Sequence, residues 1–306
     1  MPPRIAFLGT PAVAVPVLRA LAEAVQVEAV FCNADKPTGR GRRVAAPPVK
    51  EAALELGLPV HQPLRWKDPG TQALWDALGI DLAVVVAYGH ILPGWMLDSL
   101  PLGAWNLHFS LLPRWRGAAP VNHAILAGDA ETGVALMRIT AGLDEGPVLA
   151  TAKRPIGPAD DAEGLLAALA EDAASLLRVN LAALLDGSAR PAPQAGEATY
   201  AAKLSREMAR LDPARPALEL HRQVRALQPW PGAELATERG SLKVAAVGGL
   251  RASDDAPGTL RWDKGGAWLT CGGGQAVELL RLQRPGKPVQ PALQALQPFG
   301  AGGAIR

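Results

Sequence analysis

Three polar side chains in the first half of the sequence have the types needed for chemistry at a carbonyl carbon. Asn106 and His108 stand two positions apart in "NLHFSLLPRWRGAAP", and Asp144 lies in "GLDEGP". Residues two apart on a strand point to the same face, so the carboxamide and the imidazole are expected side by side. A carboxamide can donate to a developing oxyanion, an imidazole can move a proton and a carboxylate can orient the imidazole. The set suits transfer of an acyl group to an amine.

The sequence also bears on whether the transfer is direct or passes through a covalent intermediate. No serine stands in a G-x-S-x-G setting, so direct transfer between two bound substrates is more economical than a covalent intermediate. The spacing also allows a structural interpretation. A histidine at a strand end is usually a satisfied structural residue, an asparagine there usually caps a turn, and Asp144 in "LDEG" is typical of a turn. On spacing alone, the structural interpretation is favoured.

The elements that must position these residues follow an α/β pattern. Strand-like runs alternate with helical stretches from "RIAFLG" to "GPVLATAKRPI", and the run "DLAVVVAYG" is apolar almost throughout. Such a run is typical of a central strand in a parallel sheet covered by helices, so we predict a doubly wound, Rossmann-like α/β domain. Ligands of these sheets bind beyond the carboxyl ends of the strands, where "AYGHIL" and "NLHFSLLP" both begin.

The remaining chain predicts a second domain. A long helix is expected over 161–187, after which the periodicity fails in a segment rich in Pro, Gly and Ala. One helix over 216–227 and several short strand-like segments follow, which indicate a small β-barrel. The 306 residues fit about two domains. We therefore predict a catalytic domain over 1–188, a linker over 189–206 and a barrel domain over 207–306.

Composition excludes several classes of protein. The two cysteines are far apart and the five histidines lack metal-ligand spacing, so neither a disulfide framework nor a catalytic metal is expected. No apolar run reaches the roughly 18 residues of a membrane-spanning helix. Gly9-Thr10-Pro11 interrupts the apolar run that a signal peptide would need. A cytoplasmic protein is expected.

Charge is distributed unevenly. Residues 1–206 hold 18 Lys and Arg against 20 Asp and Glu, a net charge of −2, whereas 207–306 hold 13 against 9, a net charge of +4. Within the first domain, "NADKPTGRGRRVAAPPVK" (33–50) holds five basic residues and one acid. Its Pro and Gly residues exclude a helix, so an extended loop at the ligand-binding edge is predicted. The loop is either simply solvated or contacts the phosphates of a nucleic acid.

Taken together, these stretches resemble the methionyl-tRNA formyltransferase family over nearly the whole chain. The resemblance rests on "FLGTP" (7–11), "DKPTGRGRR" (35–43), "VVVAYGHILP" (84–93), "NLHFSLLPRWRGAAP" (106–120), "GDAETGV" (128–134), "GLDEGP" (142–147) and "QPWPGA" (228–233). The element S-L-L-P-x-x-R-G alone indicates only formyl transfer from a folate. The basic loop and the second domain narrow the resemblance to the tRNA enzymes. Phe109 and Glu145 depart from the commonest form of the motifs, but neither replaces a catalytic group.

The resemblance implies a reaction and the residues for it. The formyl group of 10-formyltetrahydrofolate would pass to the α-amine of initiator methionyl-tRNA. Asn106 would hold the formyl oxygen, and His108, oriented by Asp144, would act on the proton leaving the amine, on the developing oxyanion, or on both in turn. The second domain would be OB-like, and a monomer that needs no metal is expected. The folate pocket would comprise Ser110, Leu111, Leu112, Pro113, Val86, Ala87, Tyr88, Gly89, Ile91 and Leu92. Contacts with tRNA would come from Lys36, Arg40, Arg42 and Arg43 at the acceptor stem, and from the basic second domain over 207–306.

Alternative functions remain at this point. A formyltransferase acting on an amino-sugar nucleotide would share the catalytic set but would not need Arg40, Arg42 and Arg43. Enzymes acting on glycinamide ribonucleotide resemble only the first domain. A non-catalytic RNA-binding protein would be expected to have lost part of the catalytic set. The sequence favours a structural role for Arg116 and leaves the role of Arg114 open.

Overall fold

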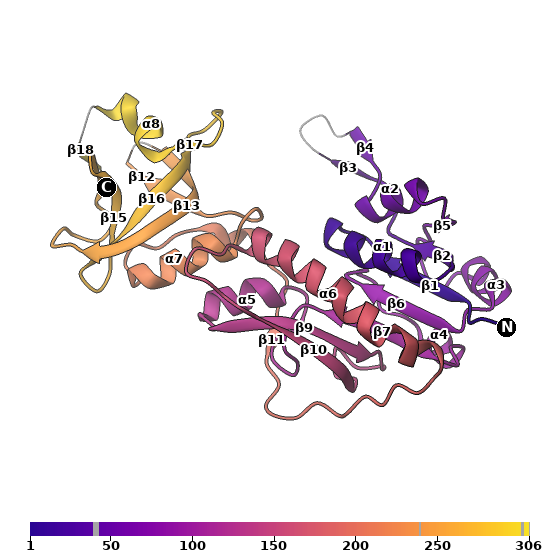
Figure 1. The fold of residues 1–306 in the computed structure, drawn as a ribbon. Coiled ribbons are helices and arrows are strands. Elements are labelled where there is room, and N and C mark those ends of the chain that lie inside the picture. Colours follow the sequence, from indigo (N-terminus) through magenta and orange to yellow (C-terminus); the bar gives the residue numbers. More distant parts are fainter. Residues whose placement is uncertain (39–42, 239, 301–302, 306) are drawn as a thin grey trace. The chain divides into compact units, whose positions relative to one another are not determined.

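The chain folds into two compact units in a computed structural model that describes residues 1–38, 43–238, 240–300 and 303–305 (Figure 1). The first unit comprises 1–117, 132–154 and 166–200, and the second comprises 118–131, 155–165 and 201–306. The chain therefore contributes three segments to each unit. The domain boundaries at residues 188 and 206 stay a prediction.

A seven-stranded sheet forms the centre of the first unit, in the order β10-β9-β7-β6-β1-β2-β5. Neighbouring strands from β5 to β7 run parallel, and β9 is antiparallel to β7. From β1 the chain builds β2 and β5 on one side and then β6 and β7 on the other. The topological switch therefore lies between β1 and β6, and ligands bind at such a switch. The strands are β1 (Ile5–Gly9), β2 (Val27–Phe31), β5 (Val60–His61), β6 (Leu82–Val86), β7 (Gly103–His108), β9 (Glu131–Arg138) and β10 (Val148–Pro155).

The burial of β1 and β6 matches that of central strands covered on both faces. All five residues of β1 and all five of β6 are buried, as expected for strands with helices on both faces. The prediction of a doubly wound α/β domain is confirmed.

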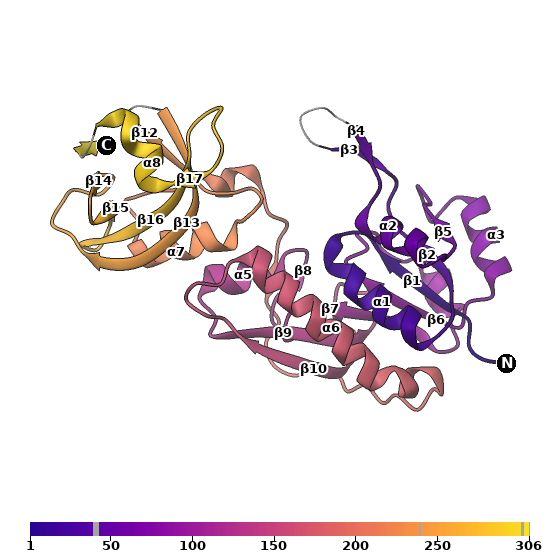
Figure 2. The same cartoon turned by 45° about the horizontal axis from the view of Figure 1, so that its top comes forward.

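Helices flank this sheet, and α6 runs across β9 and β10 in both views (Figures 1 and 2). The long helix predicted over 161–187 is α6. The short helices α4 and α5 were not predicted, because so few residues carry no readable 3.6-residue period. The helices of the first two-thirds of the chain are α1 (Val15–Ala24), α2 (Pro48–Glu55), α3 (Pro69–Leu78), α4 (Gly94–Asp98), α5 (Pro120–Ala127) and α6 (Ala162–Leu185), with a 3₁₀ turn over Ala12–Ala14.

The basic segment forms a hairpin stem where an extended loop was predicted. Strand β3 (Lys36–Thr38) pairs antiparallel with β4 (Arg43–Ala45). Lys36 is exposed on β3. Arg40 and Arg42 lie outside the described residues, and Arg43 is described only through the backbone of β4.

A polar cluster anchors the base of this hairpin. Lys50 Nζ lies 2.8 Å from Asp35 Oδ2 and donates to Gln62 Oε1 at 2.9 Å. Gln62 Nε2 in turn donates to Asp35 Oδ1 at 2.8 Å and to the Asn33 carbonyl at 2.7 Å. Lys50 is thus engaged in an internal ion pair. The hydrogen bonds from Lys50 and then Gln62 hold the pKa of Asp35 below its ordinary value.

Asp35→Asn is expected to lower thermal stability at pH 7 but not in acid. Because the folded-state pKa of Asp35 is depressed, its stabilisation is present above the unfolded-state pKa of about 3.9 and is lost as the pH falls through the lower folded value. Melting temperatures of wild type and variant should therefore begin to converge below about pH 4 and should coincide only once the pH lies below the lower folded-state pKa of Asp35. A constant difference from pH 7 to pH 3 would show that the Asp35 charge contributes nothing.

The second unit is built on an antiparallel sheet in the order β12-β13-β16-β15-β14-β18, with β17 paired to β16. Helix α7 packs on β13 and β16, and buried residues such as Leu220, Leu242 and Leu282 share one core. The predicted barrel-like second domain is confirmed. Its elements are η2 (Arg206–Ala209), α7 (Ala217–Ala226), β12 (Glu234–Thr237), β13 (Gly240–Ala252), β14 (Leu260–Asp263), β15 (Gly266–Cys271), β16 (Gln275–Gln283), β17 (Gln290–Pro291), α8 (Ala292–Leu296), η3 (Gln297–Phe299) and β18 (Gly303–Ile305).

Candidate active site

The ends of β6 and β7 bring the predicted site residues to one edge of the sheet. The two strands are parallel neighbours, with Val85 in register with Asn106. On β7, Leu107 is 1% exposed, His108 is buried and Asn106 is half-buried. The alternation of a strand thus puts Asn106 and His108 on one face and Leu107 on the other.

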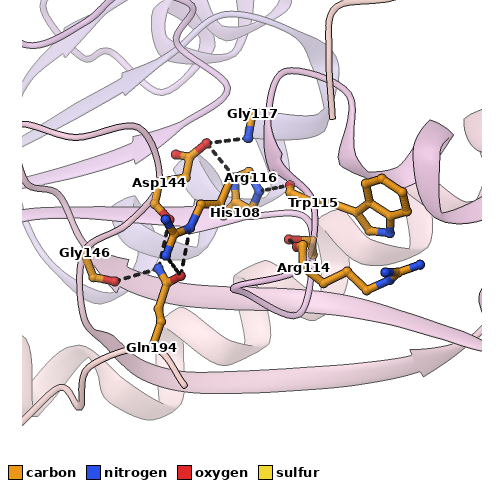
Figure 3. A network of polar contacts seen from close by, with 9 residues as sticks. His108, Arg114, Trp115, Arg116, Gly117, Asp144, Gly146 and Gln194 are labelled. Atoms are coloured by element: carbon orange, nitrogen blue, oxygen red, sulfur yellow. Dashed lines mark hydrogen bonds and ion pairs between the residues drawn. The ribbon is translucent and has the colours of Figure 1, made fainter. Parts of the chain in front are cut away.

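His108 contacts protein groups through both ring nitrogens (Figure 3). Nε2 lies 2.9 Å from the Trp115 carbonyl oxygen. A carbonyl only accepts, so Nε2 is the nitrogen that carries a proton. Nδ1 lies 3.7 Å from Asp144 Oδ2, which is too long for a hydrogen bond. The Trp115 carbonyl therefore orients the ring, and Nδ1 faces the carboxylate with its lone pair available in the neutral imidazole.

Local backbone geometry fixes the position of Asp144. Asp144 has a φ of +49°, a left-handed conformation that Asp tolerates better than most residues. Its Oδ2 accepts the Gly117 N–H at 2.8 Å. Nearby, a Cβ on Gly146 would lie 1.9 Å from the Arg138 carbonyl oxygen, so only glycine fits there. The "GLDEGP" segment thus folds tightly enough to hold the carboxylate beside His108.

The "SLLP" segment follows β7 directly. The Ser110 hydroxyl is buried and donates to the Arg114 carbonyl at 2.6 Å, so it stabilises its own turn. Leu111, Leu112 and Pro113 are half-buried. Of the predicted pocket residues on this segment, the two leucines and the proline are the ones that retain accessible surface.

The loop after β6 separates into buried and exposed positions. Val86, Tyr88 and Leu92 are buried, and burial raises the pKa of the Tyr88 hydroxyl. Ala87 and Gly89 are exposed, and Ile91 is 88% exposed. The exposed residues offer surface to a ligand, whereas Tyr88 and Leu92 belong to the core beneath.

Arg116 and Gln194 form a hydrogen-bond network beside the site. Neither residue was among those predicted from the sequence to act in catalysis or binding. Arg116 Nε and Nη2 donate to Gln194 Oε1 at 3.1 and 2.7 Å, and Gln194 Nε2 donates to the carbonyls of Asp144 and Gly146, both at 2.8 Å (Figure 3). The sequence favoured a structural role for Arg116. It predicted no role for Gln194, which lies in the segment predicted to be a linker. A single glutamine in a stretch of Pro and Ala carries no spacing signal that could have identified it.

Both cysteines, Cys32 and Cys271, are buried and unpaired by disulfide. Burial raises the pKa of Cys32 and of Cys271 to about 11, so both thiols are neutral at pH 7. No cluster of three potential metal ligands occurs in the part of the chain that the structure describes. Within the same residues, no helix has the length and apolar character needed to span a membrane.

Comparison with known proteins identifies the family of this chain. Residues 3–180 match the formyl transferase family, and residues 203–300 match the formyl transferase C-terminal domain. The chain belongs to the formyl transferase family. It is 47% identical to the methionyl-tRNA formyltransferase of Paracoccus denitrificans over 96% of this chain and 97% of that protein. It is 46% identical to the enzyme of the same name from Nitrosococcus oceani, over 94% and 90% of the two chains. The resemblance inferred from the motifs is confirmed.

Solved structures share the fold at much lower identity. WlaRD, a sugar 3N-formyl transferase, matches with a TM-score of 0.68 and 17% identity over 94% of this chain and all of that chain. HypX from Aquifex aeolicus matches with a TM-score of 0.65 and 17% identity over 98% of this chain and 48% of that chain. These likenesses concern the fold alone.

Proposed function

We propose that this protein transfers the formyl group of 10-formyltetrahydrofolate to the α-amine of initiator methionyl-tRNA, in the cytoplasm, for translation initiation. The observation that carries the proposal is the identity of 47% and 46% to two methionyl-tRNA formyltransferases over 90% or more of both chains. The placement of Asn106, His108 and Asp144 at one sheet edge supports it.

The chain's own residues would divide the chemistry between them. The folate donor supplies a formyl carbon on nitrogen for the amine to attack. Asn106 donates its amide N–H to the formyl oxygen as negative charge develops there. His108 Nδ1 takes the proton released by the amine, and the Asp144 carboxylate at 3.7 Å stabilises the imidazolium. His108 then returns the proton to the leaving nitrogen.

The residues around the site fit a folate. Ile91, Leu111 and Leu112 each retain accessible apolar surface, which an aromatic ring system could contact. The exposed backbone of Ala87 and Gly89 can bind its polar edge. The protein is proposed to bind the donor and the tRNA as a monomer.

The basic segment over 33–50 is proposed to bind tRNA phosphates. Replacing Arg40, Arg42 and Arg43 together with Ala should raise the KM for tRNA and reduce its salt dependence, because each lost phosphate contact lowers the slope of log affinity against log salt by about 0.7–0.9. Initial rates from about 50 to about 300 mM KCl would measure that slope.

A matched control removes the same charge elsewhere. Arg4, Arg19 and Arg178 form exposed ion pairs with Glu28, Glu55 and Glu23 in the first unit. Their triple Ala variant should keep the wild-type slope. Equal slopes for all three proteins would show that the basic segment is only solvated.

The direct test is formylation of purified substrates. The protein, 10-formyltetrahydrofolate and methionylated initiator tRNA should yield formylmethionyl-tRNA, while methionylated elongator tRNA should not. If folded protein formylates neither tRNA, the proposal is wrong. An amino-sugar nucleotide is then the acceptor to test.

A further inference from the structure

The segment after α6 is fastened to both loops that face His108. Ala192 and Val148 exchange two backbone hydrogen bonds of 2.8 and 2.9 Å. Thr199 Oγ1 accepts the Trp115 N–H at 2.9 Å, and the Thr199 carbonyl accepts the Arg116 N–H at 2.9 Å. The segment therefore runs past the loop that carries Asp144 and past the loop that carries Trp115.

Gln194 joins the two loops through one carboxamide. Its Oε1 accepts two hydrogen bonds from Arg116, and its Nε2 donates one each to the carbonyls of Asp144 and Gly146. A carboxamide has two acceptor sites and two donors, so all four are used. A guanidinium only donates and a carbonyl only accepts, so the amide fits in one orientation only.

The loops joined in this way hold the groups that face the two ring nitrogens of His108. Arg116 is the covalent neighbour of Trp115, whose carbonyl binds Nε2. Asp144, whose main-chain carbonyl Gln194 binds, carries the carboxylate 3.7 Å from Nδ1. Gln194 itself touches neither nitrogen.

We propose that Gln194 is a positioning residue, which fixes the separation of the Trp115 and Asp144 loops and thereby holds His108 and Asp144 in their working geometry. This inference rests on the proposed function. Through Gln194, the segment predicted to be a linker would influence the rate of catalysis. A carboxamide is required at this position, because glutamate can accept from Arg116 but cannot donate to the two carbonyls.

Gln194→Met and Gln194→Glu test the inference in the full-length protein. Both variants should lower kcat by about tenfold or more, since misplacing a reacting group by 1 Å can cost about 10²-fold. The KM values for donor and tRNA should change less than about threefold, because the lost interactions do not bind substrate. Arg116→Met combined with Gln194→Met should be no slower than the slower single variant, because the two residues act as one unit.

Gln223 supplies the matched control. It also donates from Nε2 to two carbonyls, those of Met208 and Arg210, at 2.7 and 3.0 Å, but it does so in the second unit. Gln223→Met should lower the melting temperature and leave kcat unchanged. The Gln194 variants should lower kcat at temperatures where they remain folded.

The outcomes separate this inference from the proposed function. No product from the wild type would overturn the function. An active wild type with unchanged kcat in Gln194→Met would overturn the positioning role. Equal losses of kcat in Gln194→Met and Gln223→Met would also overturn it, since the effect would then be general destabilisation. A crystal structure of Gln194→Met should show Asp144 displaced from His108, and an unmoved Asp144 would contradict the proposal.

Discussion

Asn106→Ala is expected to reduce kcat about 10²- to 10³-fold, which is the usual cost of removing one oxyanion donor. Asn106 lies on β7 in register with Val85 on one side and Met137 on the other. Its carboxamide makes no hydrogen bond to another residue that the structure describes, so the side chain has donors available for the formyl oxygen. The loss should appear in kcat, because the charge develops only in the transition state.

The free energy of unfolding should change little in Asn106→Ala. Removing a half-buried carboxamide without a protein partner leaves no orphaned group behind. Asn180 on α6, whose Nδ2 donates to the Leu176 carbonyl, provides the control. Asn180→Ala should keep wild-type kcat. Near-normal turnover in Asn106→Ala, measured with saturating donor and tRNA, would rule out the oxyanion role.

Those parts of the fold that depend on local patterns could be predicted from the sequence. The apolar run Leu82–Val86 indicates a central strand by itself, and the periodic segment Ala162–Leu185 indicates a long helix. The helices Gly94–Asp98 and Pro120–Ala127 are too short for a period to be recognised. The hairpin stem in the basic segment was missed because each strand has only three residues.

The part of the candidate site that lies on one strand could be predicted from the sequence, but the contacts between loops could not. Asn106 and His108 are brought together by the two-residue period of one strand, which the sequence displays directly. The orientation of His108 depends on the carbonyl of Trp115, a backbone atom that residue type does not reveal. The contact between Gln194 and Gly146 joins residues 48 apart, and a coil segment gives no register from which to predict it.

His108→Gln is expected to lower kcat about 10²- to 10⁴-fold, the usual contribution of a positioned general base. Glutamine can still donate its amide N–H to the Trp115 carbonyl, which His108 Nε2 contacts at 2.9 Å. It cannot accept a proton from an amine near pH 7. The substitution therefore separates the role of His108 in holding the loop from its role in proton transfer.

His123 provides the control for His108→Gln. His123 Nε2 also contacts a backbone carbonyl, that of Ala202 at 3.1 Å, in the second unit. His123→Gln should keep wild-type kcat. If His108→Gln also keeps wild-type kcat while His108→Ala loses it, the imidazole serves only to hold the Trp115 loop, and the amine proton must leave by way of solvent or Asp144. If both His108 variants lose kcat to the same extent, while circular dichroism shows them folded, proton transfer through Nδ1 accounts for the loss.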